Sequence, residues 1–271
     1  MMETNKDDII PQRFLTNMLN QRCNIISNPQ TGKTNLTKVI VSEYVRQGFP
    51  VQIKMFDTCQ VFRHSFLESF KLQEINGNTS ADYGGEDNIV FDMEYDDSEE
   101  IMQFIGRDLQ RNFHKNREIK KNTQLKKWTL YVIEEAQNSL GRYALSRSTG
   151  RFWMKAISEG ANFGLGFLFV GQRAADISTS VIERSTVSFI GKTTGDNNIR
   201  KVKSLVGNDA GEEQLGIPIH EACKTLELGQ FIWWNGQEAW RFRCPLFEDL
   251  YPNQKPLMIT PPPPKRWEKI F

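Results

Sequence analysis

The segment Ser27-Asn28-Pro29-Gln30-Thr31-Gly32-Lys33-Thr34 limits what this chain can fold into more than any other part of it. It ends like the phosphate-binding pattern G-x-x-x-x-G-K-[ST], in which backbone N–H groups surround phosphates at the start of a helix. An apolar stretch at 23–26 precedes it, and apolar residues recur at helical spacing over 36–45 before Gly48. Strand, loop and helix therefore follow in the order that a phosphate site needs, although a chance Gly-Lys-Thr in a turn is the alternative.

The segment departs from the pattern at its first glycine, which is Ser27. We expect this serine to be strained, because glycine adopts positive φ angles more readily, and Pro29 removes one backbone donor. Lys33 is expected to neutralise the β- and γ-phosphates of ATP, and the Thr34 hydroxyl to ligate Mg²⁺. The predicted nucleotide-binding residues are Ser27, Asn28, Pro29, Gln30, Thr31, Gly32, Lys33, Thr34 and Asn35.

Length and composition allow one large α/β domain or two small ones in 271 residues. The net charge of +1 gives no global field, so any polyanion site must be a local patch. No apolar run approaches the roughly 20 residues of a membrane helix, and the polar start is unlike a signal peptide. The four cysteines are scattered, which favours reduced, mostly buried thiols. We therefore expect a cytoplasmic protein without membrane contact.

Strands and helices are predicted to alternate, which implies a parallel sheet with helices on both faces. Expected strands cover 51–57, 89–93, 128–133, 167–170 and 186–190. Expected helices cover 8–20, 60–72, 98–117, 150–159 and 176–183, with a loop over 76–88. A hairpin over 229–242 should turn at Asn235-Gly236.

Three regions follow from this pattern: a lead-in segment over 1–20, a nucleotide-binding domain over 21–250 and a proline-rich tail over 251–271. Four consecutive prolines at 261–264 enforce an extended conformation in the tail. The tail is either an arm that binds a partner protein or a segment without fixed structure.

The second half of a nucleotide site is predicted at the ends of two further apolar strands. Glu134 and Glu135 follow the strand at 128–133, and Gln172 follows the strand at 167–170. An NTPase with this loop needs an acidic residue near Mg²⁺ and a group that orients the attacking water. We assign the metal to Thr34 and Glu134, water activation to Glu135, and γ-phosphate sensing to Gln172; a solvated acidic turn is the alternative.

Three strings together resemble the HerA/FtsK superfamily of ring-forming ATPases over residues 20 to 245: 132–137 (VIEEAQ), 159–166 (EGANFGLG) and 170–177 (VGQRAADI). The resemblance implies a RecA-like P-loop NTPase, acting as a hexameric motor that moves double-stranded DNA with ATP and Mg²⁺. Because no separate barrel precedes the loop, the build is similar to compact viral packaging ATPases. Conjugation and DNA-processing ATPases share the motifs, and a nucleotide-dependent switch or scaffold is a further alternative.

One residue that the resemblance implies is missing. The family often has an arginine finger in the segment E-G-R-x-x-G, and here that position is Ala161. Candidate replacements are Arg151, Arg147 and Arg142, with Arg151 preferred, although each can be an ordinary surface arginine.

Charge is separated between residues 82 and 127, where an acidic block precedes a basic one. The basic residues expected to contact DNA phosphates are Lys115, Arg117, Lys120, Lys121, Lys126 and Lys127. A solvated helix and turn is an equal alternative. Lys192, Arg200, Lys201 and Lys203 form a second, less favoured basic group. A packaging role would place the protein in the host cytoplasm, with possible association with the virion.

Overall fold

The computed structural model describes residues 10–62, 69–75, 87–94, 97–122, 127–141 and 148–252. The tail from residue 253, most of the expected loop over 76–88, and Arg142, Arg147 and Lys126 lie outside these residues. None of the helices within these described ranges is long and apolar enough to span a bilayer.

Within the described residues, one nine-stranded sheet forms the centre of the protein, in the order β3-β4-β2-β5-β6-β1-β7-β8-β9. Its first seven strands are parallel, and β8 and β9 form an antiparallel hairpin at one edge. The strands are β1 (Cys23–Ile26), β2 (Val51–Asp57), β3 (Phe70–Ile75), β4 (Asn88–Met93), β5 (Trp128–Ile133), β6 (Leu165–Gly171), β7 (Val187–Gly191), β8 (Gln230–Trp234) and β9 (Ala239–Arg243).

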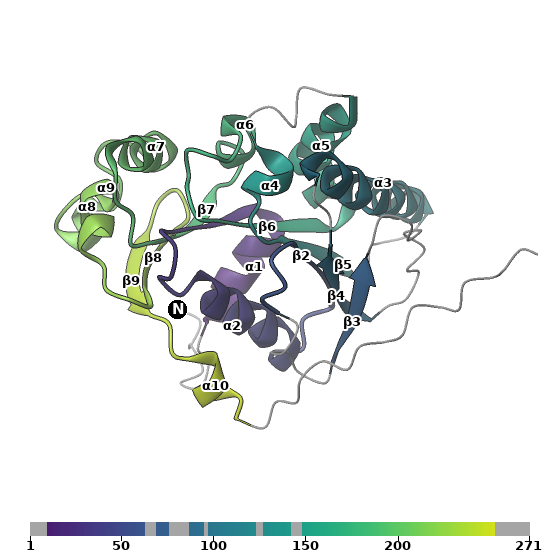
Figure 1. Ribbon diagram of the computed structural model, residues 1–271, viewed down its shortest axis with the longest axis horizontal. Coiled ribbons are helices and arrows are strands. Elements are labelled where there is room, and N and C mark those ends of the chain that lie inside the picture. Colours follow the sequence, from purple (N-terminus) through teal and green to yellow (C-terminus); the bar gives the residue numbers. More distant parts are fainter. Residues whose placement is uncertain are drawn as a thin grey trace, which may run out of the picture.

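Helices cover both faces of the sheet, as Figure 1 shows. On one face lie α1 (Gln12–Asn20) and α2 (Lys33–Arg46), with α10 (Phe247–Leu250) beside α2. The other face carries α3 (Ser98–Asn122), α4 (Gln137–Leu140), α5 (Ser148–Glu159), the 3₁₀ turn η2 (Gly160–Phe163) and α6 (Thr179–Ile182). Beside the hairpin lie α7 (Asp196–Val206), α8 (Glu212–Leu215), α9 (Ile219–Ala222) and η3 (Cys223–Thr225).

The central strands are apolar on both sides because each side packs against a different helix layer. In β5, Leu130 and Val132 join the core under α1 and α2, whereas Tyr131 and Ile133 join the core under α3 and α5. This alternation explains why the strand is a nearly continuous apolar run in the sequence.

Helix α1, in the described part of the expected lead-in segment, packs against the hairpin. The Phe14 ring of α1 stacks on Trp233 of β8 with centroids 3.9 Å apart, and the Tyr44 hydroxyl of α2 donates to the Leu15 carbonyl at 2.6 Å. The hairpin itself is confirmed, because Gly236 has a φ of +93° and the Asn235 side chain accepts two backbone N–H bonds in the turn.

The expected helix over 60–72 is wrong at both of its described ends, because residues 60–62 are not helical and Phe70–Ile75 forms β3 beside β4. Phe70 and Leu72 are buried while Lys71 is exposed, which is the period of a strand. Other helices also differ from expectation. The one over 176–183 is a single turn, Thr179–Ile182, and α4, α7, α8, α9 and α10 were not predicted at all. Of the four free cysteines, Cys23, Cys223 and Cys244 are buried and Cys59 is exposed.

Candidate nucleotide site

The loop from Ser27 to Gly32 connects the end of β1 to the start of α2. Gly32 caps the helix with a φ of +101°, in the left-handed region that glycine adopts without cost. α2 then extends over 14 residues, so its free N–H groups and the positive end of its dipole face the loop. This geometry makes the loop a site for an anion such as a phosphate.

The expected strain at Ser27 is absent, because among the described non-glycine residues positive φ angles occur only at Gln30, Gln60 and Glu135. The Ser27 hydroxyl instead hydrogen-bonds the Thr31 hydroxyl and donates to the Lys192 carbonyl at 3.0 Å. Space for the Ser27 side chain exists because residue 191 on β7 is glycine. A Cβ atom at that position would lie 2.4 Å from the Ser27 Oγ. The serine is therefore tolerated through a glycine on the neighbouring strand.

Lys33, the first residue of α2, is buried beneath the loop. Its ammonium donates to the carbonyls of Ser27 at 3.2 Å and Asn28 at 2.9 Å. Burial lowers the pKa of Lys33, and the carboxylates of Glu135 and Glu134 oppose that change. The cation thus lies between the loop and the acidic strand end.

Glu134 follows β5 directly and is 3% exposed. Burial raises its pKa to about 8, and the nearby carboxylates of Asp57 and Glu135 add to the rise. The Oε1 atom of Glu134 is buried without a hydrogen-bond partner. Mg²⁺ prefers oxygen ligands and keeps several waters, so this orphaned oxygen fits a hydrated magnesium ion. Among the described residues, no group of three or more acidic, histidine or cysteine side chains is arranged to hold a metal ion by itself, so the remaining ligands would come from Thr34 and the nucleotide.

Asp57 is a member of this site that the sequence reasoning missed. It ends β2, the strand paired with β5, and it is fully buried. Its carboxylate accepts backbone N–H bonds from Cys59 at 3.1 Å and Phe62 at 2.8 Å. Burial raises the pKa of Asp57, and these backbone bonds oppose the rise.

Glu135 is held in a defined position by two amides. The Gln172 side chain donates to Glu135 Oε1 at 2.5 Å, and the Gln137 side chain donates to Oε2. The backbone of Glu135 has a φ of +44°, which is uncommon for a residue with a side chain and marks local strain. The structure thus brings the predicted Glu135 and Gln172 together and adds Gln137. The only sequence signal for Gln137 is its position two residues after Glu135.

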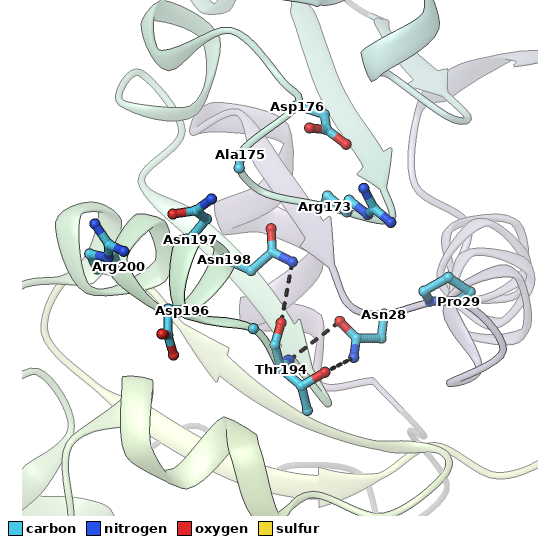
Figure 2. A pocket seen from close by; sticks show the side chains of 11 residues that line it. Asn28, Pro29, Arg173, Ala175, Asp176, Thr194, Asp196, Asn197, Asn198 and Arg200 are labelled. Carbon is cyan, nitrogen blue, oxygen red and sulfur yellow. Dashed lines mark hydrogen bonds between the residues drawn. The ribbon is translucent and has the colours of Figure 1, made fainter.

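A cavity of about 650 Å³ opens beside the loop, between the segments that follow β6 and β7. Figure 2 shows Asn28 and Pro29 on one side of it, with Arg173 and Asp176 on another. The Asn28 side chain donates to the Thr194 hydroxyl at 2.6 Å, which ties the loop to the segment after β7. Eight of the eleven residues that line the cavity have polar or charged side chains.

No family model and no curated protein sequence matches the chain. Solved structures do. The genome packaging NTPase B204 of Sulfolobus turreted icosahedral virus 2, in complex with AMPPCP, matches with a TM-score of 0.60 at 15% identity, over 84% of this chain and 99% of that one. The conjugation coupling protein TcpA of pCW3, with ATPγS, matches with a TM-score of 0.53 at 15% identity, over 86% of this chain and 63% of that one. The cytoplasmic domain of the Type VII secretion ATPase EccC of Thermomonospora curvata matches with a TM-score of 0.50 at 12% identity, over 83% of this chain and 25% of that one.

The chain has a P-loop NTPase fold. At these identities the likeness establishes the fold, and the neighbours agree with the resemblance to the HerA/FtsK superfamily. In this fold, β1, β5 and β6 are adjacent parallel strands, so their carboxyl ends present Lys33, Glu134, Glu135 and Gln172 at one edge of the sheet.

Other predicted residues lie elsewhere in the P-loop NTPase fold. The Asn35 side chain bonds Pro245 and Phe247, not the loop. Arg151 is exposed near the start of α5. Ala161 lies in η2, which leads into the amino end of β6, at the opposite edge of the sheet from the loop.

The predicted DNA-contacting residues that the structure describes are Lys115, Arg117, Lys120, Lys121 and Lys127, in the last turns of α3 and just before β5. Lys120 donates to the Asn162 carbonyl at 2.6 Å, and Lys121 pairs with Glu118 at 2.7 Å. This basic group therefore lies with η2 at the amino edge of the sheet, away from the nucleotide site.

Substituting Gly191→Ala should destabilise the protein by about 2 kcal/mol, because the new methyl group overpacks against Ser27 and Phe231. The double substitution Ser27→Gly with Gly191→Ala should recover part of that loss, since only the Phe231 contact remains. Urea unfolding of both variants and of Ser27→Gly alone measures the coupling. If the losses of unfolding free energy in the two single variants simply add in the double variant, the steric contact between position 191 and Ser27 is refuted.

The stability of the unliganded protein should fall as pH rises from about 5 to 8. Glu134 ionises near pH 4.3 in an unfolded chain and near pH 8 in the fold, so the folded state binds one more proton between these values. Each unit of pKa difference corresponds to ~1.4 kcal/mol. Urea unfolding at pH 5 and at pH 8 should show that the free energy of unfolding falls less for Glu134→Gln than for the wild type. Equal falls in the two proteins would refute the raised pKa of Glu134.

Proposed function

We propose that the protein is an ATP-hydrolysing, ring-forming motor that translocates double-stranded DNA, with viral genome packaging as its role. The observation that carries the proposal is the convergence of Lys33, Glu134, Glu135 and Gln172 at one sheet edge. The match to B204 over 99% of that chain supports a compact packaging ATPase. TcpA, described as a conjugation coupling protein, keeps conjugation as the second candidate.

Each residue has a distinct part in the proposed hydrolysis. Lys33 exchanges its two loop carbonyls for phosphate oxygens, which costs little because bonds to neutral carbonyl oxygens are replaced by bonds to anionic oxygens. Glu135, fixed by Gln172 and Gln137, accepts a proton from the attacking water. Magnesium, held by Thr34 and Glu134, would neutralise charge that develops on the phosphates.

The basic group at the end of α3 is the proposed DNA surface, in which exposed lysine and arginine contact phosphates without reading sequence. A homo-oligomeric ring, proposed as a hexamer, would place these groups around a pore. The proline-rich tail is a proposed contact for a protein partner, and the proposed locations are the host cytoplasm and the virion.

The proposed chemistry predicts different phenotypes for two substitutions. Lys33→Ala should remove ATP binding and hydrolysis, because the phosphates lose their cation. Glu135→Gln should lower kcat by at least ~100-fold while ATP binding persists, since a general base typically contributes 10² to 10⁴-fold. Calorimetric ATP titration and phosphate release measure the two properties. Full turnover by Glu135→Gln would remove its assigned role.

The proposed DNA surface predicts that duplex DNA stimulates hydrolysis at low salt and that the stimulation fades as salt rises. The pair Lys115→Gln and Arg117→Gln should weaken DNA binding and stimulation while leaving DNA-free hydrolysis unchanged. Lys224→Gln, at an exposed lysine within η3, is the matched control. Absence of stimulation in the wild type would favour a nucleotide-dependent switch, and light scattering with ATP present tests the ring.

A further inference from the structure

Two exposed leucines lie beside the phosphate-binding loop. Leu228 and Leu246 are 66% and 60% exposed, the highest fractions among large apolar side chains of the described residues. A single exposed leucine is ordinary. These two differ, because the segment of Leu228 contacts the loop and the segment of Leu246 contacts the first turn of α2.

The segment of Leu228 is joined to the loop by backbone contacts. The N–H of Gly229 donates to the Thr31 carbonyl at 3.1 Å. A Cβ atom on Gly32 would lie 3.4 Å from the Gly229 Cα. The Cys244 N–H donates to the Gly229 carbonyl at 2.8 Å, so the chain leaving β9 lies beside the chain entering β8.

The segment of Leu246 is held by Asn35 in the first turn of α2. The Asn35 amide donates to the Pro245 carbonyl at 2.8 Å and accepts the Phe247 N–H at 2.8 Å. One side chain thus fixes the peptide groups on both sides of Leu246. Asn35 was predicted to touch the nucleotide, and here it orients the neighbouring apolar residue.

The order of strands gives the direction of a bound nucleotide. Glu135 and Gln172, which serve the phosphate that is cleaved, follow β5 and β6 on one side of β1, whereas β7, β8 and β9 lie on the other. The rest of a nucleoside triphosphate must therefore extend away from β5 and β6, across the start of α2, toward the segments of Leu228 and Leu246.

We infer that Leu228 and Leu246 form an apolar subsite for the base of the nucleoside triphosphate whose phosphates occupy the loop; this inference rests on the proposed function. The carbonyl of Leu228 accepts a bond from Arg243, and that of Leu246 accepts bonds from Asp249 and Leu250. With these carbonyls engaged, the leucines offer apolar surface to the face of a base ring. The site takes a nucleotide in preference to an inorganic triphosphate.

The test compares ATP with inorganic tripolyphosphate, each with Mg²⁺, by calorimetry on the full chain. Leu228→Ala and Leu246→Ala should each weaken ATP binding on the order of tenfold, the effect of uncovering part of a leucine side chain. Tripolyphosphate affinity should stay within about twofold, because the loop is intact. Ile217→Ala, an exposed apolar residue between α8 and α9, should change neither.

Unchanged ATP affinity in the double leucine variant would overturn the subsite, and so would equal weakening of both ligands. Lys33→Ala tests the phosphate site independently of the leucine subsite, because it should abolish binding of ATP and of tripolyphosphate alike. If the wild type binds ATP through Lys33 but the leucine variants bind as well as it does, only the subsite fails. If the wild type binds neither ligand, the proposed function and the subsite both fail.

Discussion

Parallel pairing of β5, β6 and β1 is the constraint on which the rest of the site depends. In this register Ile133 lies beside Phe169, and Ile26 lies beside Gly171, so the three strands end at nearly the same level. Parallel strands carry their carboxyl ends to one edge, where side chains from distant parts of the sequence meet. The buried apolar faces of these strands therefore do more than stabilise the protein, because they fix the positions of Lys33, Glu134 and Gln172.

The same arrangement separates the nucleotide site from the basic group at the other edge of the sheet. α3 joins the two edges: it begins after β4 and ends near η2, where Lys120 bonds the Asn162 carbonyl. In its middle, Asp108 accepts bonds from Lys54 of β2 at 2.7 Å and from the Tyr131 hydroxyl of β5 at 2.9 Å. These are the strands that end at Asp57 and Glu134. This buried ion pair and the tyrosine hydrogen bond connect α3 directly to the strands that carry the acidic groups.

The sequence predicted the parts of this site that follow from local order. Near-continuous apolar runs located β5, β6 and β7, and polar residues directly after β5 and β6 located Glu134, Glu135 and Gln172. Neighbouring strands were not predictable in the same way. Asp57 contributes to the site only because β2 pairs with β5, and Ser27 is accommodated only because Gly191 lies on the strand beside it. The error at Phe70–Ile75 has a similar cause, because the end of that short segment is set by pairing with β4.

Departures from ordinary stability rules gather at the carboxyl edge of the sheet. Glu135 has a positive φ, Glu134 is a buried carboxyl with an unpartnered oxygen, and Lys33 is a buried cation that bonds loop carbonyls. Each of these costs free energy in the unliganded protein, since burial disfavours charge and unbonded polar atoms. A bound triphosphate with its metal would offset two of these costs together, by supplying anionic oxygens to Lys33 and a cation to Glu134. The concentration of such costs at one edge, beside a helix N-terminus, is therefore the structural reason to expect tight coupling between nucleotide binding and the stability of this region.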